Sequence, residues 1–222
     1  MKRHLLLIFT VICIGIIIPC KVHAVDVTVG ATTWYVWSSE GGDVDPGFLI
    51  GPAASIKFTH DYNLTFVYLY GKFTATTESG DNFKIKRHDS DLALNYKLNK
   101  YSKVFGGIKY IGLSSKQEVE SDAYGPGLGL SGSYPITKNL FALGYVSVFY
   151  LWGVKDYADD GKDYFNNCGF NSNLSAAYYI ASASTAVSLG WRYQYFIGIK
   201  DDNNKKFYGV TIAATYTFGS LL

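Results

Sequence analysis

A side-chain alternation with a period of two restricts the fold of this sequence more than any other feature. It is clearest between Arg87 and Leu113, where apolar and polar residues alternate on both sides of a turn at 99–102. Because successive side chains of a strand point to opposite faces, each half predicts a strand with one apolar and one polar face. The same turn places Asp91 opposite Lys109 on the polar face, where the two can form a cross-strand ion pair.

The N-terminus predicts export from the cytoplasm. Met1-Lys2-Arg3-His4 precedes an apolar run from Leu5 to Ile18, which is shorter than the roughly 20 residues that a membrane-spanning helix needs. We therefore predict a signal peptide over residues 1–24, cleaved after Ala24, and a single domain over residues 25–222. A lipoprotein processed at Cys20 is the alternative, but Pro19 stands where a small residue should precede that cysteine.

Removal of the signal peptide changes the charge and the cysteine content. The count of Lys plus Arg falls from 20 to 17 against 18 acidic residues, and this near-neutral balance argues against nucleic acid as a partner. Cys168 remains as the single cysteine, so no internal disulfide is expected. The mature chain also lacks a second apolar run of about 20 residues, which excludes a helical membrane protein.

The alternation recurs often enough to predict about ten strands. Besides the two in the opening stretch, the predicted strands cover Val27–Ser38, Phe48–Phe58, Leu64–Tyr70, Gly127–Ile136, Leu140–Trp152, Phe170–Ile180, Val187–Tyr195 and Tyr208–Phe218. Short turns alternate with longer polar loops at Glu40–Pro46, Thr77–Lys84, Ser115–Pro126, Val154–Asn167 and Lys200–Lys206. The first and seventh strands have no clear polar face, so eight strands are the alternative.

Strict alternation of short turns and longer loops is how an antiparallel up-and-down transmembrane β-barrel is connected. A secreted β-sandwich would also alternate. Here, however, large aromatic residues lie near the ends of most strands, and the sequence holds 19 Tyr and 4 Trp but 1 Met. Tyr and Trp favour the boundary between lipid and water, so the all-β class is predicted to be a transmembrane barrel.

With these features the chain resembles the small outer-membrane β-barrel proteins of Gram-negative bacteria. The resemblance covers Val25 to Phe218, and the last strand ends in Tyr216-Thr217-Phe218, similar to the aromatic-ended signal that the barrel assembly machinery reads. The departure is the tail Gly219-Ser220-Leu221-Leu222, because such chains usually stop at the aromatic residue. The resemblance implies the cell outer membrane as location, with outer-membrane lipid, lipopolysaccharide and the assembly machinery as partners of a monomer.

The polar faces of the strands predict what lines the lumen. A narrow barrel is largely filled by its own side chains, and charges in such a confined space favour opposite partners. The residues predicted to point inward are Lys57, Asp89, Asp91, Asn95, Lys109, Asn171, Asn173 and Arg192, together with Lys97 and Gln194. This mixed set favours a plug over a thin pore, and Arg192 is expected beside Asn171 or Asn173.

Two further patterns raise enzymatic or metal-binding hypotheses. His88 and Ser90 share the outward face, similar to the His and Ser of outer-membrane lipid A deacylases. The acid that would orient the histidine is missing at the facing position of the neighbouring strand. An Asp–His pair of the kind found in ten-stranded outer-membrane proteases would have to use Asp122 or Asp159. Short patterns of this kind arise by chance, and a bland histidine near the rim is the preferred interpretation.

The acidic loop residues Asp156, Asp159, Asp160 and Asp163 lack the spacing of a calcium-binding loop, so neither a metal nor another cofactor is predicted. The leading hypothesis is a non-enzymatic outer-membrane barrel with a structural or loop-mediated role in the envelope. A narrow pore for small solutes or ions is the second hypothesis, and a lipid A-directed hydrolase is the third.

Overall fold

The computed structural model describes residues 26–39, 44–76, 82–115, 119–157, 161–199 and 204–218. These residues form the strands β1 (Asp26–Ser38), β2 (Gly47–Lys57), β3 (Tyr62–Thr76), β4 (Asn82–Lys97), β5 (Ser102–Ser115), β6 (Val119–Pro135), β7 (Leu140–Tyr157), β8 (Gly161–Ile180), β9 (Thr185–Gly198) and β10 (Lys205–Phe218). A 3-10 turn, Ala181–Ala183, joins β8 to β9. The predicted signal peptide and the tail after Phe218 lie outside the described residues.

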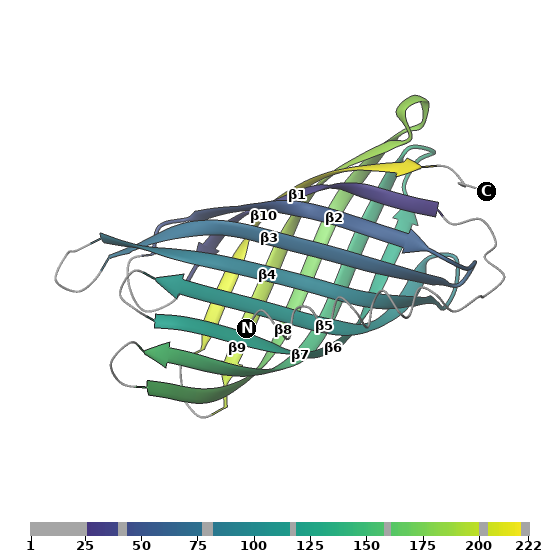
Figure 1. Ribbon diagram of the computed structural model, residues 1–222. Coiled ribbons are helices and arrows are strands. Elements are labelled where there is room, and N and C mark those ends of the chain that lie inside the picture. Colours follow the sequence, from purple (N-terminus) through teal and green to yellow (C-terminus); the bar gives the residue numbers. More distant parts are fainter. Residues whose placement is uncertain are drawn as a thin grey trace.

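Each strand pairs antiparallel with its neighbours in the sequence, and β1 pairs with β10, so the sheet closes into a barrel (Figure 1). The closing register runs from Val27 opposite Phe218 to Ser38 opposite Phe207. Closure leaves every described strand with two neighbours, which removes the exposed edges of an open sheet. The predicted antiparallel up-and-down barrel is confirmed, whereas the eight-strand and sandwich alternatives are wrong.

Among the described residues, no helix is both long enough and apolar enough to cross a membrane.

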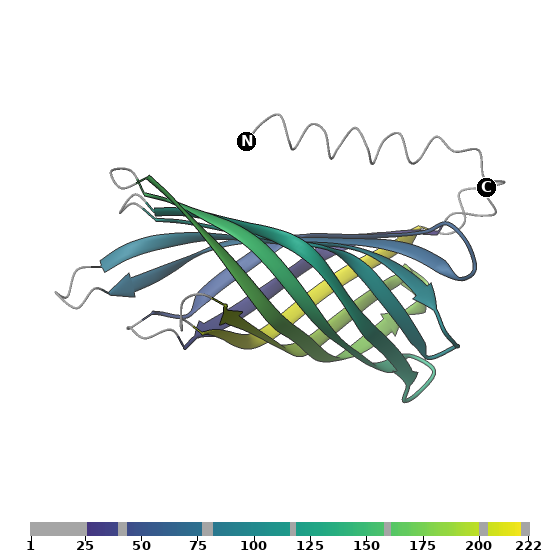
Figure 2. The ribbon, with the colours of Figure 1, turned by 90° about the horizontal axis from the view of Figure 1, so that it is seen from below.

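The two ends of the barrel differ in their connections. Short turns at residues 58–61, 98–101, 136–139 and 181–184 lie at the end where β1 begins and β10 finishes, and we call this end the turn rim. The opposite end is the loop rim, where β1 leads toward β2 and β3 toward β4 (Figure 2). In a transmembrane barrel, short turns face the periplasm and the longer connections face the exterior.

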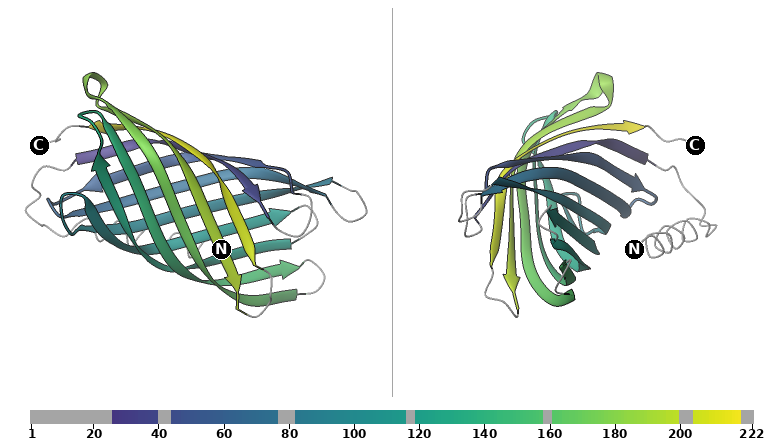
Figure 3. Two further views of the ribbon diagram at one scale, coloured as in Figure 1. Left: turned by 180° about the vertical axis from the view of Figure 1, so that it is seen from behind. Right: turned by 60° about the vertical axis from the view of Figure 1, so that its left-hand side comes forward.

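The outer surface is an apolar band bordered by aromatic side chains. Leu128, Leu174 and Leu189, which point outward at mid-strand, are 60%, 70% and 59% exposed. Exposed aromatic residues lie nearer both rims, among them Tyr62, Tyr96, Tyr134 and Phe218 toward the turn rim and Tyr35, Phe48, Tyr124 and Trp152 toward the loop rim. The strands tilt around this band (Figure 3), and its chemistry matches the lipid-facing side of a membrane barrel.

Several strands extend further toward the loop rim than the sequence predicted. The segment Val119–Pro126 belongs to β6, and the segments Val154–Tyr157 and Gly161–Asn167 belong to β7 and β8, so these parts of the predicted loops are wrong. Cross-strand pairing explains the extension: Asp156 lies directly opposite Lys162 and forms an ion pair with it at 3.4 Å. Polar residues on both faces of a segment therefore show that the strand continues beyond the apolar band, and they do not mark its end.

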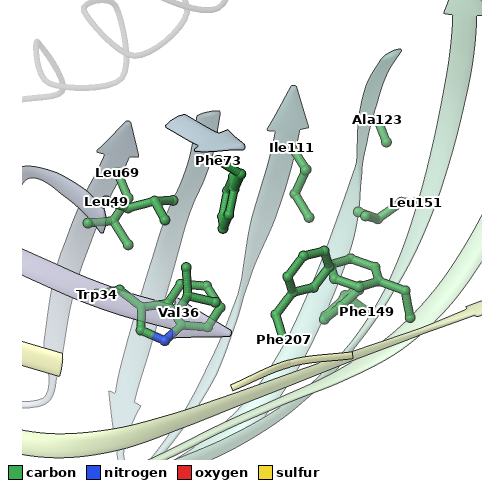
Figure 4. Close-up of a cluster of buried hydrophobic side chains, with 11 residues drawn as sticks. Trp34, Val36, Leu49, Leu69, Phe73, Ile111, Ala123, Phe149, Leu151 and Phe207 are labelled. Atoms are coloured by element: carbon green, nitrogen blue, oxygen red, sulfur yellow. The ribbon is translucent and has the colours of Figure 1, made fainter. Parts of the chain in front are cut away.

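The strands without a clear polar face direct apolar side chains into the lumen. Trp34 and Val36 of β1 are fully buried, whereas Tyr35 between them points outward. On β7, Phe149 and Leu151 are buried inside the barrel. These residues belong to an apolar layer nearer the loop rim that also includes Leu49, Leu69, Phe73, Ile111, Ala123, Phe196 and Phe207 (Figure 4).

Candidate functional site

Five charged side chains meet inside the barrel next to the apolar layer, and we call this group the charged layer. It consists of Arg87, Asp89 and Asp91 on β4, Lys109 on β5 and Arg192 on β9. Because strand side chains alternate, residues 87, 89 and 91 all point to the same, inward face. The register places Lys109 directly opposite Asp91, which confirms the pairing predicted from the turn.

Every cation of the charged layer contacts a carboxylate. The Asp89 carboxylate lies 2.7 Å from Nζ of Lys109, 3.0 Å from Nη2 of Arg87 and 3.7 Å from Nη2 of Arg192. Asp91 lies 3.0 Å from Lys109 and 3.4 Å from Arg192. The two carboxylates thus join three strands across the lumen, and charge-assisted hydrogen bonds of this kind are stronger than neutral ones.

Polar and aromatic neighbours complete the charged layer. Arg87 donates a hydrogen bond to Oε1 of Gln194, and Nε of Arg192 donates to Oδ1 of Asn171 at 3.3 Å. The guanidinium of Arg192 also lies 4.6 Å from the ring centre of Trp34, and that of Arg87 lies 4.1 Å from the ring centre of Phe207. Such cation–π contacts favour a charged group that has lost its water.

Burial shows that the charged and apolar layers fill the cross-section of the lumen. Trp34 and Gln194 are fully buried, Arg87 and Asp89 are 1% exposed and Lys109 is 3% exposed. A cavity of about 70 Å³ lies on the loop-rim side, lined by Arg87, Leu151 and Phe207 among others. A second cavity of about 190 Å³ lies on the turn-rim side, where Asp91 and Lys109 form its deep end.

The other predicted lumen residues lie nearer the turn rim, outside the charged layer. Asn95 is buried and donates to the carbonyl oxygens of Asn63 and Ala93 and to Oγ1 of Thr65. Asn173 lies opposite Arg192 but donates to Thr211 at 3.2 Å. Lys57 pairs with Asp26 at 3.2 Å in an exposed position at the turn rim.

Sequence reasoning missed two residues of this region. Arg87 has the same inward parity as Asp89 and Asp91, so the period of two was the signal that would have included it. Trp34 begins the stretch Trp34–Trp37, in which both faces of β1 carry apolar or aromatic residues, so the sequence carried no signal for its direction. Its contact with Arg192 joins β1 to β9, which are not neighbours in the sheet.

The outward-facing His88 is hydrogen-bonded to a tyrosine, whereas the hydrolase hypothesis requires an acid at that position. Its Nδ1 forms a hydrogen bond of 2.6 Å with the hydroxyl of Tyr68, and Gly112 lies opposite it on β5. Asp122 accepts a hydrogen bond of 2.6 Å from Tyr110 instead. Within the described residues, neither a carboxylate nor Ser90 is hydrogen-bonded to His88, so the three groups of a nucleophilic triad are not assembled there.

In the part of the chain that the structure describes, no group of three or more His, Cys, Asp or Glu side chains is placed to hold a metal ion. Asp159 and Asp160 of the predicted acidic loop lie outside the described residues. Asp156 is engaged by Lys162.

Comparison with known proteins shows similarity of architecture. No protein-family model and no curated protein sequence matches the chain. Among solved structures, similar chains include Ail, the attachment invasion locus protein of Yersinia pestis, at 10% identity and a TM-score of 0.42, covering 88% of this chain and 99% of Ail. The translocator domain of the autotransporter NalP from Neisseria meningitidis has 11% identity and a TM-score of 0.47, covering 94% of this chain and 93% of that domain.

The outer membrane protein OprG from Pseudomonas aeruginosa is similar at 13% identity and a TM-score of 0.38, covering 90% of this chain and 98% of OprG. The predicted general resemblance to Gram-negative outer-membrane β-barrels is confirmed, without a subfamily. Identities and TM-scores this low carry no functional assignment, so any argument about function depends on the lumen and the surface of this chain.

Proposed function

We propose that this protein is a non-enzymatic integral outer-membrane barrel whose lumen is closed by its own charged layer, and that its role in the envelope is structural or carried by the loop rim. The observation behind this proposal is the burial of Arg87, Asp89 and Lys109, at 1% to 3% exposure, in the middle of the lumen. Charges excluded from water at this depth leave no continuous wet path for ions. The ion pairs that satisfy them hold the plug together.

Outward-facing lysines at the loop rim support contact with lipopolysaccharide. Lys72 and Lys86 are exposed and lie directly opposite each other on β3 and β4, one outward position beyond Tyr70 and His88. Like charges in this position destabilise a strand pair unless an anion lies between them. Phosphate groups of the outer leaflet supply such an anion just above an aromatic border, and the barrel contacts them as a monomer inserted by the assembly machinery.

Single-channel recording in a planar bilayer tests the closed lumen. We expect the refolded parent to be silent, because the charged layer blocks the path. An Asp91→Ala variant is expected to conduct, because Lys109 loses one of its two carboxylates and Arg192 loses its nearer one. The matched control is Asp26→Asn, which removes an exposed carboxylate at the turn rim and should remain silent.

A narrow pore is the second candidate, and one observation favours it. The side chain of Asp91 is 34% exposed toward the turn-rim cavity, so one carboxylate of the charged layer is reachable from that side. Steady conductance of the parent, altered in Asp91→Ala but unchanged in Asp26→Asn, would overturn the closed lumen and establish the pore.

A further inference from the structure

Three lysines point into the mouth of the barrel at the turn rim. Lys57 on β2, Lys97 on β4 and Lys103 on β5 share the inward parity of the lumen residues, and we call them the lysine mouth. The lysine mouth lies one inward position beyond Thr65, Asn95 and Phe105, which line the cavity of about 190 Å³. It therefore borders that cavity on the side away from the charged layer.

Two lysines of the mouth, Lys97 and Lys103, face each other, whereas Lys57 faces Asp26. Lys97 lies directly opposite Lys103, an arrangement in which two like charges repel. Lys103 reaches across β4 to Oδ1 of Asn63 at 3.4 Å, and this residue is directly opposite Lys57. Lys103 therefore extends from β5 toward the strand that pairs with the strand of Lys57, and its side chain lies between the positions of Lys97 and Lys57 in the order of the strands.

The polar contacts of the lysine mouth leave the positive charge largely uncompensated. Lys57 contacts Asp26 at 3.2 Å, and both side chains are exposed, at 48% and 38%, so water weakens this pair. Lys97 contacts Nε2 of His60 at 3.0 Å, and Lys103 contacts the neutral Asn63. Within the described residues, one carboxylate thus serves three lysines.

We propose that the lysine mouth is a binding site for a small soluble oxyanion, carrying a phosphate or carboxylate group, that enters from the turn-rim side. An oxyanion between Lys97 and Lys103 converts their repulsion into two charge-assisted hydrogen bonds. The side chains point toward the lumen, so the headgroups of lipids around the outer surface do not reach them. The ligand is therefore a solute of the aqueous space that the turn rim faces.

The deep end of the cavity restricts the anion to the mouth. Asp91 lines that end, six residues along β4 from Lys97, which corresponds to roughly 20 Å of extended strand. Its carboxylate repels a second negative charge, although Lys109 and Arg192 lie beside it. The site thus takes one anionic group at the entrance and does not pass it through the closed lumen.

Phosphorus NMR of inorganic phosphate tests this site with the full-length barrel refolded in dodecyl maltoside, a detergent without phosphate. Phosphate is titrated at constant ionic strength, and its line broadening gives the apparent Kd. We expect Lys97→Gln and Lys103→Gln each to raise this Kd by about tenfold, as for the loss of one charge-assisted hydrogen bond. The control Lys138→Gln, in the exposed turn between β6 and β7, should leave it within about twofold.

Folding of each variant is checked by heat-modifiable migration on a gel, so that a loss of binding is not confused with a loss of the barrel. Succinate added as a competitor distinguishes the two chemistries: displacement of phosphate shows that carboxylates share the site, and no displacement shows a preference for phosphate. Absence of broadening in the parent, or equal Kd changes in Lys138→Gln and Lys103→Gln, would overturn the proposal. Both results are independent of whether the barrel conducts.

Discussion

Asp89 is the centre of the charged layer, and its substitution by asparagine should destabilise the barrel far more than the loss of an exposed carboxylate. The side chain is 1% exposed and contacts Lys109, Arg87 and Arg192 at 2.7, 3.0 and 3.7 Å. Asparagine keeps the shape but removes the negative charge, so Lys109, Arg87 and Arg192 each lose one carboxylate partner. Removal of one partner from a buried ion pair costs about 3–5 kcal/mol.

The structure places the expected loss at the lower end of that range. Lys109 and Arg192 retain Asp91, at 3.0 and 3.4 Å, after Asp89 has been neutralised. We therefore expect the free energy of unfolding to fall by about 3 kcal/mol, which lowers the folding equilibrium constant by roughly two orders of magnitude. Reversible urea unfolding from phosphatidylcholine vesicles, followed by tryptophan fluorescence, measures this change.

Asp26→Asn is the matched control for Asp89→Asn. It makes the same chemical change in a pair whose side chains are 38% and 48% exposed, and such pairs contribute at most about 1 kcal/mol. Equal losses in the two variants would show that the ion pairs of the charged layer add nothing to the stability of the barrel. A gain in stability for Asp89→Asn would show that desolvation of the carboxylate outweighs its attraction to the cations, and would also refute the reasoning.

Two further substitutions, Gly209→Ala and Trp34→Ala, test the packing of the barrel by the same unfolding measurement, and Gly106→Ala is the control for the first. Gly209→Ala places a Cβ 1.9 Å from the carbonyl oxygen of Tyr35 and should lower the free energy of unfolding by about 1–3 kcal/mol. In Gly106→Ala the new Cβ meets nothing closer than 3.9 Å, so the free energy of unfolding should change by no more than about 0.5 kcal/mol. Similar losses in the two variants would refute the steric argument. Trp34→Ala removes a fully buried ring that contacts Arg192 and should cost about 3–5 kcal/mol, and a loss below about 1 kcal/mol would show that the ring does not support the closed lumen.

The sequence was informative wherever one face of a strand is apolar and the other polar. The period of two determined the inward direction of Asp89, Asp91 and Lys109, and the short turn between β4 and β5 determined the register that pairs Asp91 with Lys109. The direction of Trp34 was not predictable, because the lumen of this barrel contains an apolar layer. Around Trp34 and Val36, both faces of β1 are therefore apolar, one toward lipid and one toward that layer.

Contacts across the lumen could not be predicted from any local sequence pattern. Arg192 reaches Asp91 over a sequence separation of 101 residues, and β9 is not a neighbour of β4 in the sheet. Such a contact depends on the diameter and curvature of the closed barrel, which the alternation of side chains does not encode. The sequence therefore predicted a mixed set of inward charges but not which of them meet.

The charged layer and the lysine mouth differ in how their charge is balanced, and this difference distinguishes a plug from a binding site. In the charged layer each cation lies within 3.4 Å of a carboxylate, so the protein completes its own charge balance. In the lysine mouth Lys97 faces Lys103 across the same pair of strands, so an outside anion completes the balance.

Substitution should therefore act in opposite directions at the two positions. Asp89→Asn lowers the free energy of unfolding in any buffer, because it removes one carboxylate partner from the buried Lys109, Arg87 and Arg192. Lys103→Gln relieves a repulsion, so in phosphate-free buffer the variant should be at least as stable as the parent, and added phosphate should stabilise the parent more than the variant. Because the two positions lie far apart along the strands, the double variant should show the sum of the two effects. A Lys103→Gln variant that loses stability without phosphate would mean that this lysine supports the fold, and that the mouth is a structural feature of the rim.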